Sequence, residues 1–221
     1  MKVSVVIPTL NEEKNLPIVL SNLKKLKIID EIVIVDGHSK DKTVDIAKKF
    51  DCNILYDDKG KGSSLIKGMK KAKGDIVVSM DADNSMLSKE IPLLVSGIQT
   101  GYDVCMGSRF IQGGGTEDMS FLRKMGNKFF VCLVNLSWKM NYSDLCYGYR
   151  AFDKNCIKKL DLKSDGFGIE TEISIKTAKL GLKILEVPSY EKARKFGNGK
   201  LRTFSDGWTI LKTIISEISK R

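Results

Sequence analysis

Short apolar runs alternate with amphipathic segments along the first half of the chain. The run Val3–Pro8 is continuous and rich in β-branched residues, which is typical of a strand that is covered on both faces. Further runs of this kind predict strands at Glu31–Val35, Asn53–Tyr56, Asp75–Met80 and Tyr102–Met106. Apolar residues at helical spacing predict a helix after each of the first four strands: from Asn11 to Leu26, around Val44 to Phe50, at Ser63–Ala72 and around Ser88–Gln99.

The first helix has a predicted start signal. Asn11 follows the first strand and is expected to cap the helix. Glu12 and Glu13 would then lie in its first turn, where the positive end of the helix dipole favours acidic side chains. The apolar positions from Leu16 to Leu26 continue the helical period.

Strand and helix alternation with short connections indicates an α/β fold, with a mostly parallel central sheet and helices on both faces. In such sheets, ligands bind beyond the carboxyl ends of the strands. Three acidic residues fall at these ends, because Asp36 follows the second strand and both Asp81 and Asp83 follow the fourth. We therefore expect a functional site at this edge of the sheet.

The second half of the chain is less regular. A glycine loop, Gly113 to Gly115, precedes the helical stretch Phe121–Met140. Later elements are expected to be a helix near Glu170–Leu180, a strand at Lys183–Val187, a basic loop at Lys192–Lys200 and a last helix near Asp206–Ile218. No repeat or linker divides the chain, so the halves 1–112 and 113–221 are expected to form one continuous domain.

Composition narrows the class of protein. Of the 221 residues, 42% are apolar, which suffices for one sizeable core, and the net charge of +10 favours phosphate-bearing partners. Five cysteines without close pairs, and a chain that opens directly on a strand, favour a reducing cytosolic compartment with free thiols. One histidine and no C-x-x-C pair argue against a zinc site.

No apolar stretch reaches the roughly 18 residues needed to span a bilayer. The nearest, Phe129–Trp138, suits either a core helix or a helix that lies in the membrane interface with Arg123 and Lys128 beside lipid headgroups. The last helix, which has Trp208 among its apolar residues, could cover the core, lie in the membrane interface or contact another subunit.

The string Asp81-Ala82-Asp83 follows the predicted strand DIVVSM. Two carboxylates on alternate residues can hold one divalent cation, which in turn holds a diphosphate. Mg²⁺ and Mn²⁺ prefer such hard oxygen ligands and keep open positions for phosphate oxygens. Its position at a strand end favours this reading over a plain acidic turn.

Asp36 ends the second strand, where its carboxylate could accept hydrogen bonds from the N–H edge of a base. The alternative is a helix-capping turn, because Ser39 and Asp41 also suit caps. Lys61, in a glycine–lysine loop, is a second candidate for contact with a phosphate or base, or belongs to a plain surface loop. His38 has no partner nominated by the sequence and is expected in solvent.

Two familiar nucleotide motifs are excluded. A dinucleotide-binding fold needs glycines directly after the first strand, where Thr9-Leu10-Asn11-Glu12 stands. The loop Gly60-Lys61-Gly62-Ser63 lacks the earlier glycine and the Gly-Lys-Ser/Thr order of a phosphate loop.

Several ordered motifs cover nearly the whole chain: VSVVIPTLNEEKNL, EIVIVDGHSKDKT, GDIVVSMDAD and MGSRF. Together they resemble the inverting family-two glycosyltransferases of GT-A fold. The second half is similar to the dolichyl- or polyprenyl-phosphate sugar synthases of that family, through FLRKMGN, DLCYGYRAF and RKFGNGKL. The last string resembles R-x-x-G-x-S-K, with Gly199 in place of the serine. Mannose-transferring relatives often read D-A-D-x-Q, whereas Ser85 occupies the glutamine position here.

The resemblance implies a role for each matching residue. The nucleotide-sugar contacts it implies come from Pro8, Asn11, Glu12, Asp36, Asp81, Ala82 and Asp83, to which Lys61 is added as the candidate from the glycine–lysine loop. Asp81 and Asp83 would hold Mg²⁺ or Mn²⁺. Phosphates, above all that of the acceptor, would be held by Arg109, Arg123, Asn127, Arg194 and Lys200. Asp83 and the three arginines would thus carry catalysis, with a nucleotide-binding half at 1–112 and an acceptor half at 113–221.

The chemistry of the acceptor gives the basic residues a separate rationale. A phosphate is already an anion at neutral pH, so it needs charge neutralisation rather than a strong base, and arginines supply this through bidentate contacts. A hydroxyl acceptor would instead require a carboxylate base. Glu170, Glu172 and Asp144 are the candidates, although the two glutamates could equally pair with lysines on a helix.

The function expected from the sequence is transfer of a hexose from UDP- or GDP-hexose to polyprenyl or dolichyl phosphate. The enzyme would lie peripherally at the cytoplasmic face of a membrane and could form a homo-oligomer. The alternatives are a glycosyltransferase of the same fold that acts on a sugar hydroxyl and a sugar nucleotidyltransferase, against which PTLNEE argues. Nucleic-acid binding is not expected, because the basic residues are dispersed and no recognition motif appears.

Overall fold

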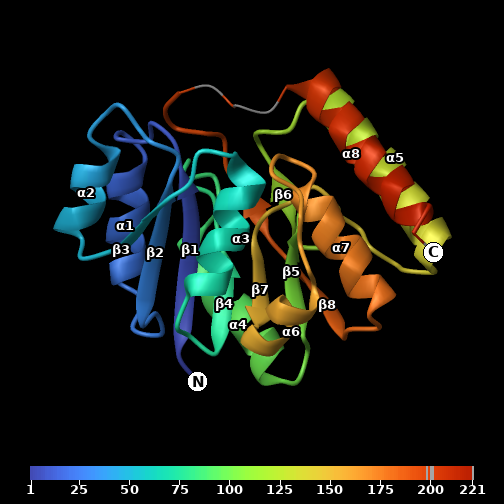
Figure 1. The fold of residues 1–221 in the computed structure, drawn as a ribbon, viewed down its shortest axis with the longest axis horizontal. Helices are drawn as coiled ribbons and strands as arrows, with labels where there is room; N and C mark the ends of the chain where they lie inside the picture. Colours follow the sequence, from blue (N-terminus) through green and yellow to red (C-terminus); the bar gives the residue numbers. More distant parts are fainter. Residues whose placement is uncertain (198, 200–201, 221) are drawn as a thin grey trace.

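A computed structural model describes residues 1–197, 199 and 202–220. Within these residues, seven strands form one sheet in the order β3-β2-β1-β4-β7-β5-β8, and a second sheet consists of β6 and β9 (Figure 1). The strands are β1 (Val3–Thr9), β2 (Glu31–Asp36), β3 (Asn53–Tyr56), β4 (Ile76–Ser79), β5 (Val104–Ser108), β6 (Gly115–Thr116), β7 (Arg150–Asp153), β8 (Ile184–Pro188) and β9 (Tyr190–Glu191).

The large sheet is parallel except for β7, which runs antiparallel between β4 and β5. The order confirms the α/β class and the mostly parallel sheet. Because β7 comes from the second half of the chain and lies between two strands of the first half, the two halves share one sheet.

Helices cover both faces of the sheet, as expected (Figure 1). They are α1 (Leu16–Lys24), α2 (Thr43–Lys49), α3 (Lys61–Lys71), the short 3-10 helix η1 (Ser88–Glu90), α4 (Ile91–Gln99), α5 (Phe121–Trp138), α6 (Lys154–Lys159), α7 (Ile169–Lys179) and α8 (Thr203–Ile218).

Each face of the sheet has its own apolar core. On one face, alternate β1 residues Val3, Val5 and Ile7 pack with apolar residues of α1, α2 and α4. On the other face, Val6 belongs to a core built with α3, α5, α6, α7 and α8. This two-sided burial explains why the strands are continuous apolar runs rather than alternating ones.

The start of the first helix differs from the prediction. Asn11 is not its cap, because α1 begins at Leu16 and the residue before it is Asn15. Asn11 instead has a left-handed backbone conformation (φ 53°), which asparagine tolerates, and its side-chain oxygen accepts a hydrogen bond from the backbone N–H of Lys40 at 2.8 Å. The segment after β1 is therefore a loop at the sheet edge.

Four short elements were not predicted: β6, β7, β9 and α6. A two-residue strand carries no periodic signal, and α6 is too short for an amphipathic stripe to stand out. β7 has only two apolar residues between two charged ones, so neither this strand nor its antiparallel direction was predicted.

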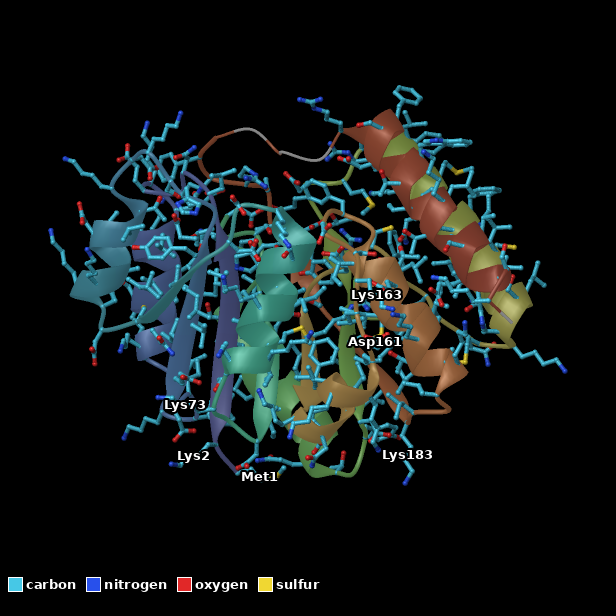
Figure 2. All side chains as sticks on the ribbon, in the orientation of Figure 1. Met1, Lys2, Lys73, Asp161, Lys163 and Lys183 are labelled. Atoms are coloured by element: carbon cyan, nitrogen blue, oxygen red, sulfur yellow. The ribbon has the colours of Figure 1, made fainter. Side chains whose placement is uncertain are left out.

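The side chains in Figure 2 show how the basic residues are distributed. Lys2, Lys73 and Lys183 lie at the end of the sheet where β1, β4 and β8 begin, away from the carboxyl ends of the parallel strands. These three lysines therefore lie away from the edge where the acidic residues meet. Among the helices of the described residues, none is long and apolar enough to cross a membrane.

Gly68 on α3 allows a close approach of helix and sheet. A Cβ at this position would lie 2.8 Å from the Cγ2 atom of Val35 and closer still to Val6. We predict that Gly68→Ala lowers the free energy of unfolding by about 1–3 kcal/mol, because the core must shift to admit the methyl group. Urea denaturation measures this change.

Gly126→Ala is the matched control, since a Cβ at Gly126 on α5 meets no atom within 4 Å. It should raise the free energy of unfolding by about 0.5–1 kcal/mol through helix propensity. Equal midpoints for both variants would contradict the tight packing of α3 on the sheet.

Candidate active site

The carboxyl ends of the central strands meet at one edge of the sheet. Thr9 at the end of β1 pairs in register with Asp36 at the end of β2. Beside them β4 ends at Ser79, so Asp81 and Asp83 follow it directly at the same edge. The predicted convergence of these acidic residues is therefore seen in the fold.

Asp83 is nearly buried and forms a hydrogen-bonded pair with an arginine. Its Oδ1 accepts the backbone N–H and the hydroxyl of Ser85, at 3.0 and 2.7 Å, and its Oδ2 accepts Nη2 of Arg194 at 2.6 Å. Burial raises the pKa of Asp83, and the neighbouring Asp81 raises it further, while Arg194 and Ser85 act in the opposite direction. Ser85, at the position of the family's glutamine, thus orients this carboxylate.

Asp81 pairs with a lysine from the start of α3. The Nζ of Lys61 lies 2.9 Å from its Oδ1 and 3.1 Å from its Oδ2. The same Nζ lies 3.0 Å from Oε1 of Glu170, on α7. Burial lowers the pKa of Lys61, but Asp81 and Glu170 together raise it above its ordinary value. Lys61 is therefore not in a plain surface loop.

Arg194 also approaches Glu12 in the loop after β1. Its Nη1 lies 3.8 Å from Oε1 of Glu12, whose Oε2 accepts Nδ2 of Asn15 at 2.8 Å. Asn15 donates to the backbone carbonyl of Phe196 as well, at 3.1 Å. The Nε of Arg194 and the Oδ1 of Asn15 are buried without a hydrogen-bond partner among the described residues. Each of these two atoms is therefore a buried polar group that the described residues leave unsatisfied.

The segment that carries Arg194 is fixed by backbone hydrogen bonds. β9 pairs with β6, and Lys192 N–H donates to the carbonyl of Ser85 at 2.9 Å. The carboxylates of Glu117 and Asp118 accept the N–H groups of Ala193 and Arg194, at 3.1 and 3.4 Å. These contacts place Arg194 over the carboxylate of Asp83.

Asp36 is fully buried at the end of β2. Its oxygens accept the hydroxyl of Thr9 at 3.0 Å and both the hydroxyl and the N–H of Ser39, at 2.6 and 2.7 Å. Ser39 also accepts the N–H of Asn11 at 2.8 Å. Asp36 and Ser39 thus form a turn, but this turn does not cap a helix as the predicted alternative had it, because α2 begins at Thr43 after Lys42. A carboxylate accepts about four hydrogen bonds, and three are described for Asp36.

Arg109 follows β5 and is buried in an ion-pair network. Its Nε and Nη2 bind Asp144 at 2.7 and 2.9 Å, and its Nη1 binds Glu191 at 3.0 Å. Its guanidinium lies 4.5 Å above the ring of Tyr147. Burial lowers the pKa of Arg109, but the two carboxylates raise it above its ordinary value. The structure therefore places Arg109 between the loop of Asp144 and β9.

Other predicted acceptor residues lie around α5. Arg123 is on its first turn and donates from Nε to the hydroxyl of Thr203 on α8, at 3.3 Å. Asn127 is buried, and its side-chain oxygen accepts the N–H groups of Leu145 and Cys146 at 3.2 and 3.1 Å. Asn127 thus braces the loop that carries Asp144. Lys200 lies outside the described residues.

The remaining candidates have clear surroundings. Pro8 lies in β1 beside Val35 of β2, and Ala82 is buried between the two aspartates. Glu172 accepts the N–H groups of Lys163 and Ser164 and pairs with Lys176 at 2.7 Å. This glutamate is therefore structural, which was one of its two predicted readings. His38 is exposed, as expected, and stacks on Tyr56.

Sequence reasoning missed several residues that build this edge. Ser85, Glu117 and Asp118 position Asp83 and Arg194, and Glu191 shares Arg109 with Asp144. Only Ser85 had a local signal, because a serine two residues after an aspartate commonly hydrogen-bonds to it in a turn. The others act across more than 70 residues of chain and are invisible to local patterns.

The residues at this edge fit a divalent ion. No group of three or more His, Cys, Asp or Glu side chains within the described residues could hold a metal by itself. Two carboxylates, Asp81 and Asp83, suit an ion that takes its other ligands from phosphate and water, as Mg²⁺ commonly does. With Glu12 and Glu170, four carboxylates lie beside two cations, Lys61 and Arg194. When all six groups are ionised, four negative and two positive charges leave a net charge of −2, which one divalent cation would balance.

Comparison with known proteins identifies the class. The profile described as Glycosyl transferase family 2 matches residues 4–161, so the chain belongs to this family of glycosyltransferases. The chain is 36% identical over 212 residues to the dolichol-phosphate mannosyltransferase of Pyrococcus furiosus, covering 91% of this chain and 60% of the relative. It therefore spans less than two thirds of that relative's length.

Two further comparisons agree with the class and the fold. The undecaprenyl-phosphate mannosyltransferase of Micrococcus luteus is 30% identical over 214 residues, covering 91% of this chain and 88% of the relative. The solved structure of glucosyl-3-phosphoglycerate synthase from Mycobacterium tuberculosis with Mn²⁺, UDP and its product has a TM-score of 0.75 at 21% identity, covering 99% of this chain and 80% of that one. The same enzyme has been solved with Mg²⁺ and UDP, with a TM-score of 0.79 at 21% identity, 99% of this chain and 79% of that one. These structural likenesses bear out the GT-A fold.

We predict that Asp83→Ala nearly abolishes sugar transfer while the chain stays folded. The change removes one of the two predicted metal ligands and the partner of Arg194, so stabilisation of the leaving diphosphate falls by roughly several kcal/mol. Transfer of radiolabelled sugar and circular dichroism measure the two effects. Asp45→Ala, at an exposed aspartate of α2, is the control and should keep full activity. A folded Asp83→Ala enzyme that remains active under chelator would refute the assignment.

Proposed function

We propose that the chain transfers a hexose from UDP-hexose or GDP-hexose to the phosphate of a polyprenyl or dolichyl phosphate, with inversion at the anomeric carbon. An acceptor phosphate oxygen forms the new bond to that carbon, and the bond from the carbon to the nucleoside diphosphate breaks. The phosphate attacks as an anion, so no proton has to be removed from it. The names of the two mannosyltransferase relatives support this acceptor class.

The position of Arg194 is the observation that carries the proposal. Its Nη2 binds Asp83 at 2.6 Å, and its Nε is a buried donor without a partner among the described residues. An unsatisfied buried donor is costly, and a phosphate oxygen is an acceptor that would satisfy it. Arg194 would thus bring a phosphate next to the predicted metal ligands and offset repulsion between two anionic reactants.

The state of the carboxylates also favours a phosphate acceptor over a hydroxyl. Each candidate base for a hydroxyl is already engaged, because Asp144 binds Arg109, Glu170 binds Lys61, and Glu172 binds Lys176 and two backbone N–H groups. A carboxylate whose oxygens already accept from a cation or backbone N–H groups has fewer lone pairs left to accept the proton of a hydroxyl. An acceptor that arrives deprotonated avoids this difficulty.

The donor side follows from the other predicted residues. Asp81 and Asp83 would hold Mg²⁺ or Mn²⁺, which supplies charge neutralisation for the departing diphosphate. Lys61 lies against Asp81, within reach of a phosphate at the same place. Asp36 and Asn11, joined through Ser39, would face the base and ribose. These residues bind and orient the donor.

The test starts from a panel of UDP- and GDP-hexoses with Mg²⁺ or Mn²⁺. Polyprenyl phosphate, 3-phosphoglycerate and oligosaccharides serve as separate acceptors. We expect a radiolabelled lipid product with one donor. Label that enters phosphoglycerate or oligosaccharide but no lipid would overturn the proposal.

Four variants then separate a phosphate acceptor from a hydroxyl acceptor. At saturating donor, Arg123→Ala and Arg194→Ala should impair lipid transfer severely, and lysine at either position should rescue only in part because it lacks the bidentate fork. Glu170→Gln and Glu172→Gln should retain most of the rate, since no base is required. A dead glutamate variant beside two active arginine variants, all folded by circular dichroism, would exclude the lipid phosphate as nucleophile.

We also propose that the α5–α8 face contacts an anionic membrane. The two helices pack against each other (Figure 1), and Arg123 of α5 contacts Thr203 of α8, so both helices begin at the same end. Their exposed apolar side chains are Phe121, Leu122, Met125, Phe129 and Leu136 on α5 and Phe204, Trp208, Ile215 and Ile218 on α8. Lys124, Lys128 and Lys212 lie on the same helices. Apolar residues mixed with cations suit the interface of an anionic bilayer.

Vesicle binding tests this face. The protein should co-sediment with vesicles of phosphatidylglycerol and phosphatidylcholine, and the double variant Phe121→Ser/Phe204→Ser should reduce the bound fraction several-fold. Both side chains are about four-fifths exposed, at 79% and 82%, so their loss should not unfold the protein. Leu93→Ser, at an exposed leucine of α4, is the control. No binding by the wild type, or a dimer in sedimentation that the double variant abolishes, would exclude the membrane as occupant.

A further inference from the structure

The contact between Lys61 and Glu170 has no role in the reaction proposed so far. Glu170 lies on the first turn of α7, more than 100 residues after Lys61, and its side chain is only 5% exposed. The lysine side chain is 22% exposed and lies 5.6 Å from the centroid of the Phe167 ring. The ammonium group thus lies against two carboxylates and an aromatic ring, while the lysine side chain as a whole stays partly exposed.

Backbone contacts fix the two elements that carry the pair. The N–H groups of Gly62 and Ser63, at the start of α3, both donate to the carbonyl of Asp165, at 2.7 and 3.1 Å. A Cβ at Gly62 would lie 2.8 Å from the carbonyl oxygen of Gly166, so glycine permits this approach. The buried Arg150 donates to the backbone carbonyl of Glu170 at 2.9 Å. The distance between Lys61 and Glu170 is therefore set by the fold.

Asp81 alone would not hold Lys61 in place once a metal ion is bound. If Asp81 binds a divalent cation, its charge is shared with that ion, and the ion repels the ammonium group of Lys61. A second carboxylate that takes no part in metal binding keeps Lys61 in place under this repulsion. Without this second carboxylate, the ion would push the ammonium group away from the place where a diphosphate would bind.

We propose that Glu170 is a positioning residue, which holds Lys61 beside Asp81 so that Lys61 binds the diphosphate of the nucleotide donor. This inference rests on the proposed function, since it assumes a nucleoside diphosphate at Asp81 and Asp83. Glu170 itself touches neither reactant and transfers no proton. Substitution of Glu170 should therefore change the affinity for the nucleotide donor, and it should do so through Lys61.

A double-mutant cycle on nucleotide binding tests the inference. UDP and GDP, each with Mg²⁺ or Mn²⁺, are titrated by calorimetry into the wild type, Lys61→Ala, Glu170→Gln and the double variant. We expect each single change to weaken the affinity about tenfold, which is within the range of coupling found for contacting charges. In the Lys61→Ala background, Glu170→Gln should be neutral or should improve binding, because the unpaired glutamate then repels the diphosphate.

Glu217→Gln is the matched control. Glu217 is likewise a buried glutamate, with a side chain 5% exposed and a lysine partner, Lys179, at 3.1 Å, but it lies on α8. Its substitution should leave nucleotide affinity unchanged. If Glu170→Gln does not fold, Glu170→Asp replaces it, because the shorter side chain keeps the charge but draws it away from Lys61 and should also weaken binding.

The outcomes separate this inference from the proposed function. Wild-type affinity in Glu170→Gln, or losses that add in the double variant, would overturn the positioning role and leave the proposed function standing. A wild type that binds neither nucleotide would overturn both. A sign reversal of the Glu170→Gln effect in the Lys61→Ala background would establish the coupling.

Discussion

Repulsion between carboxylates is the constraint on which the site depends. Glu12, Asp81, Asp83 and Glu170 converge at the carboxyl end of the sheet, and burial makes each uncompensated charge costly. Lys61 and Arg194 reduce this cost by bridging the acidic groups, each with contacts to two of them. Each of the four carboxylates thus lies within 3.8 Å of one of these two cations.

Buried arginines hold the segments of the second half of the chain that lie at this site. β7 enters the sheet between β4 and β5, and its fully buried Arg150 donates to the carbonyls of Leu145, Tyr147 and Glu170. This holds the start of α7, and with it Glu170, near Lys61. On the other side, Arg109 joins the loop of Asp144 to β9, after which the chain delivers Arg194 to Asp83. The buried arginines thus connect the second half of the chain to a site whose acidic residues come mainly from the first.

Local sequence patterns predicted those features of the fold and site that depend on residues close together in the chain. Buried parallel strands appear as apolar runs, and the acidic residues after them must meet at one edge, so the α/β fold and the convergence of Asp36, Asp81 and Asp83 were predictable. The Asn11 cap was wrong because a loop of four residues separates it from α1, although the acidic residues after it imitate a helix start. Pairs such as Lys61–Glu170 and Arg194–Asp83 depend on tertiary structure across more than 100 residues, which no periodicity encodes.

The contacts that the carboxylates already make bear on the kind of acceptor proposed for the site. At this edge of the sheet, Asp81, Glu170 and Asp144 bind cations, and Asp83 accepts a backbone N–H group. Under the proposed function the acceptor is a phosphate, which needs no deprotonation, and fixed charges would hold the reactants in place. The same arginine and lysine contacts that relieve repulsion among the protein's own acids can relieve repulsion between a diphosphate and an attacking phosphate. One distribution of charge therefore serves both the stability of the fold and the chemistry proposed for it.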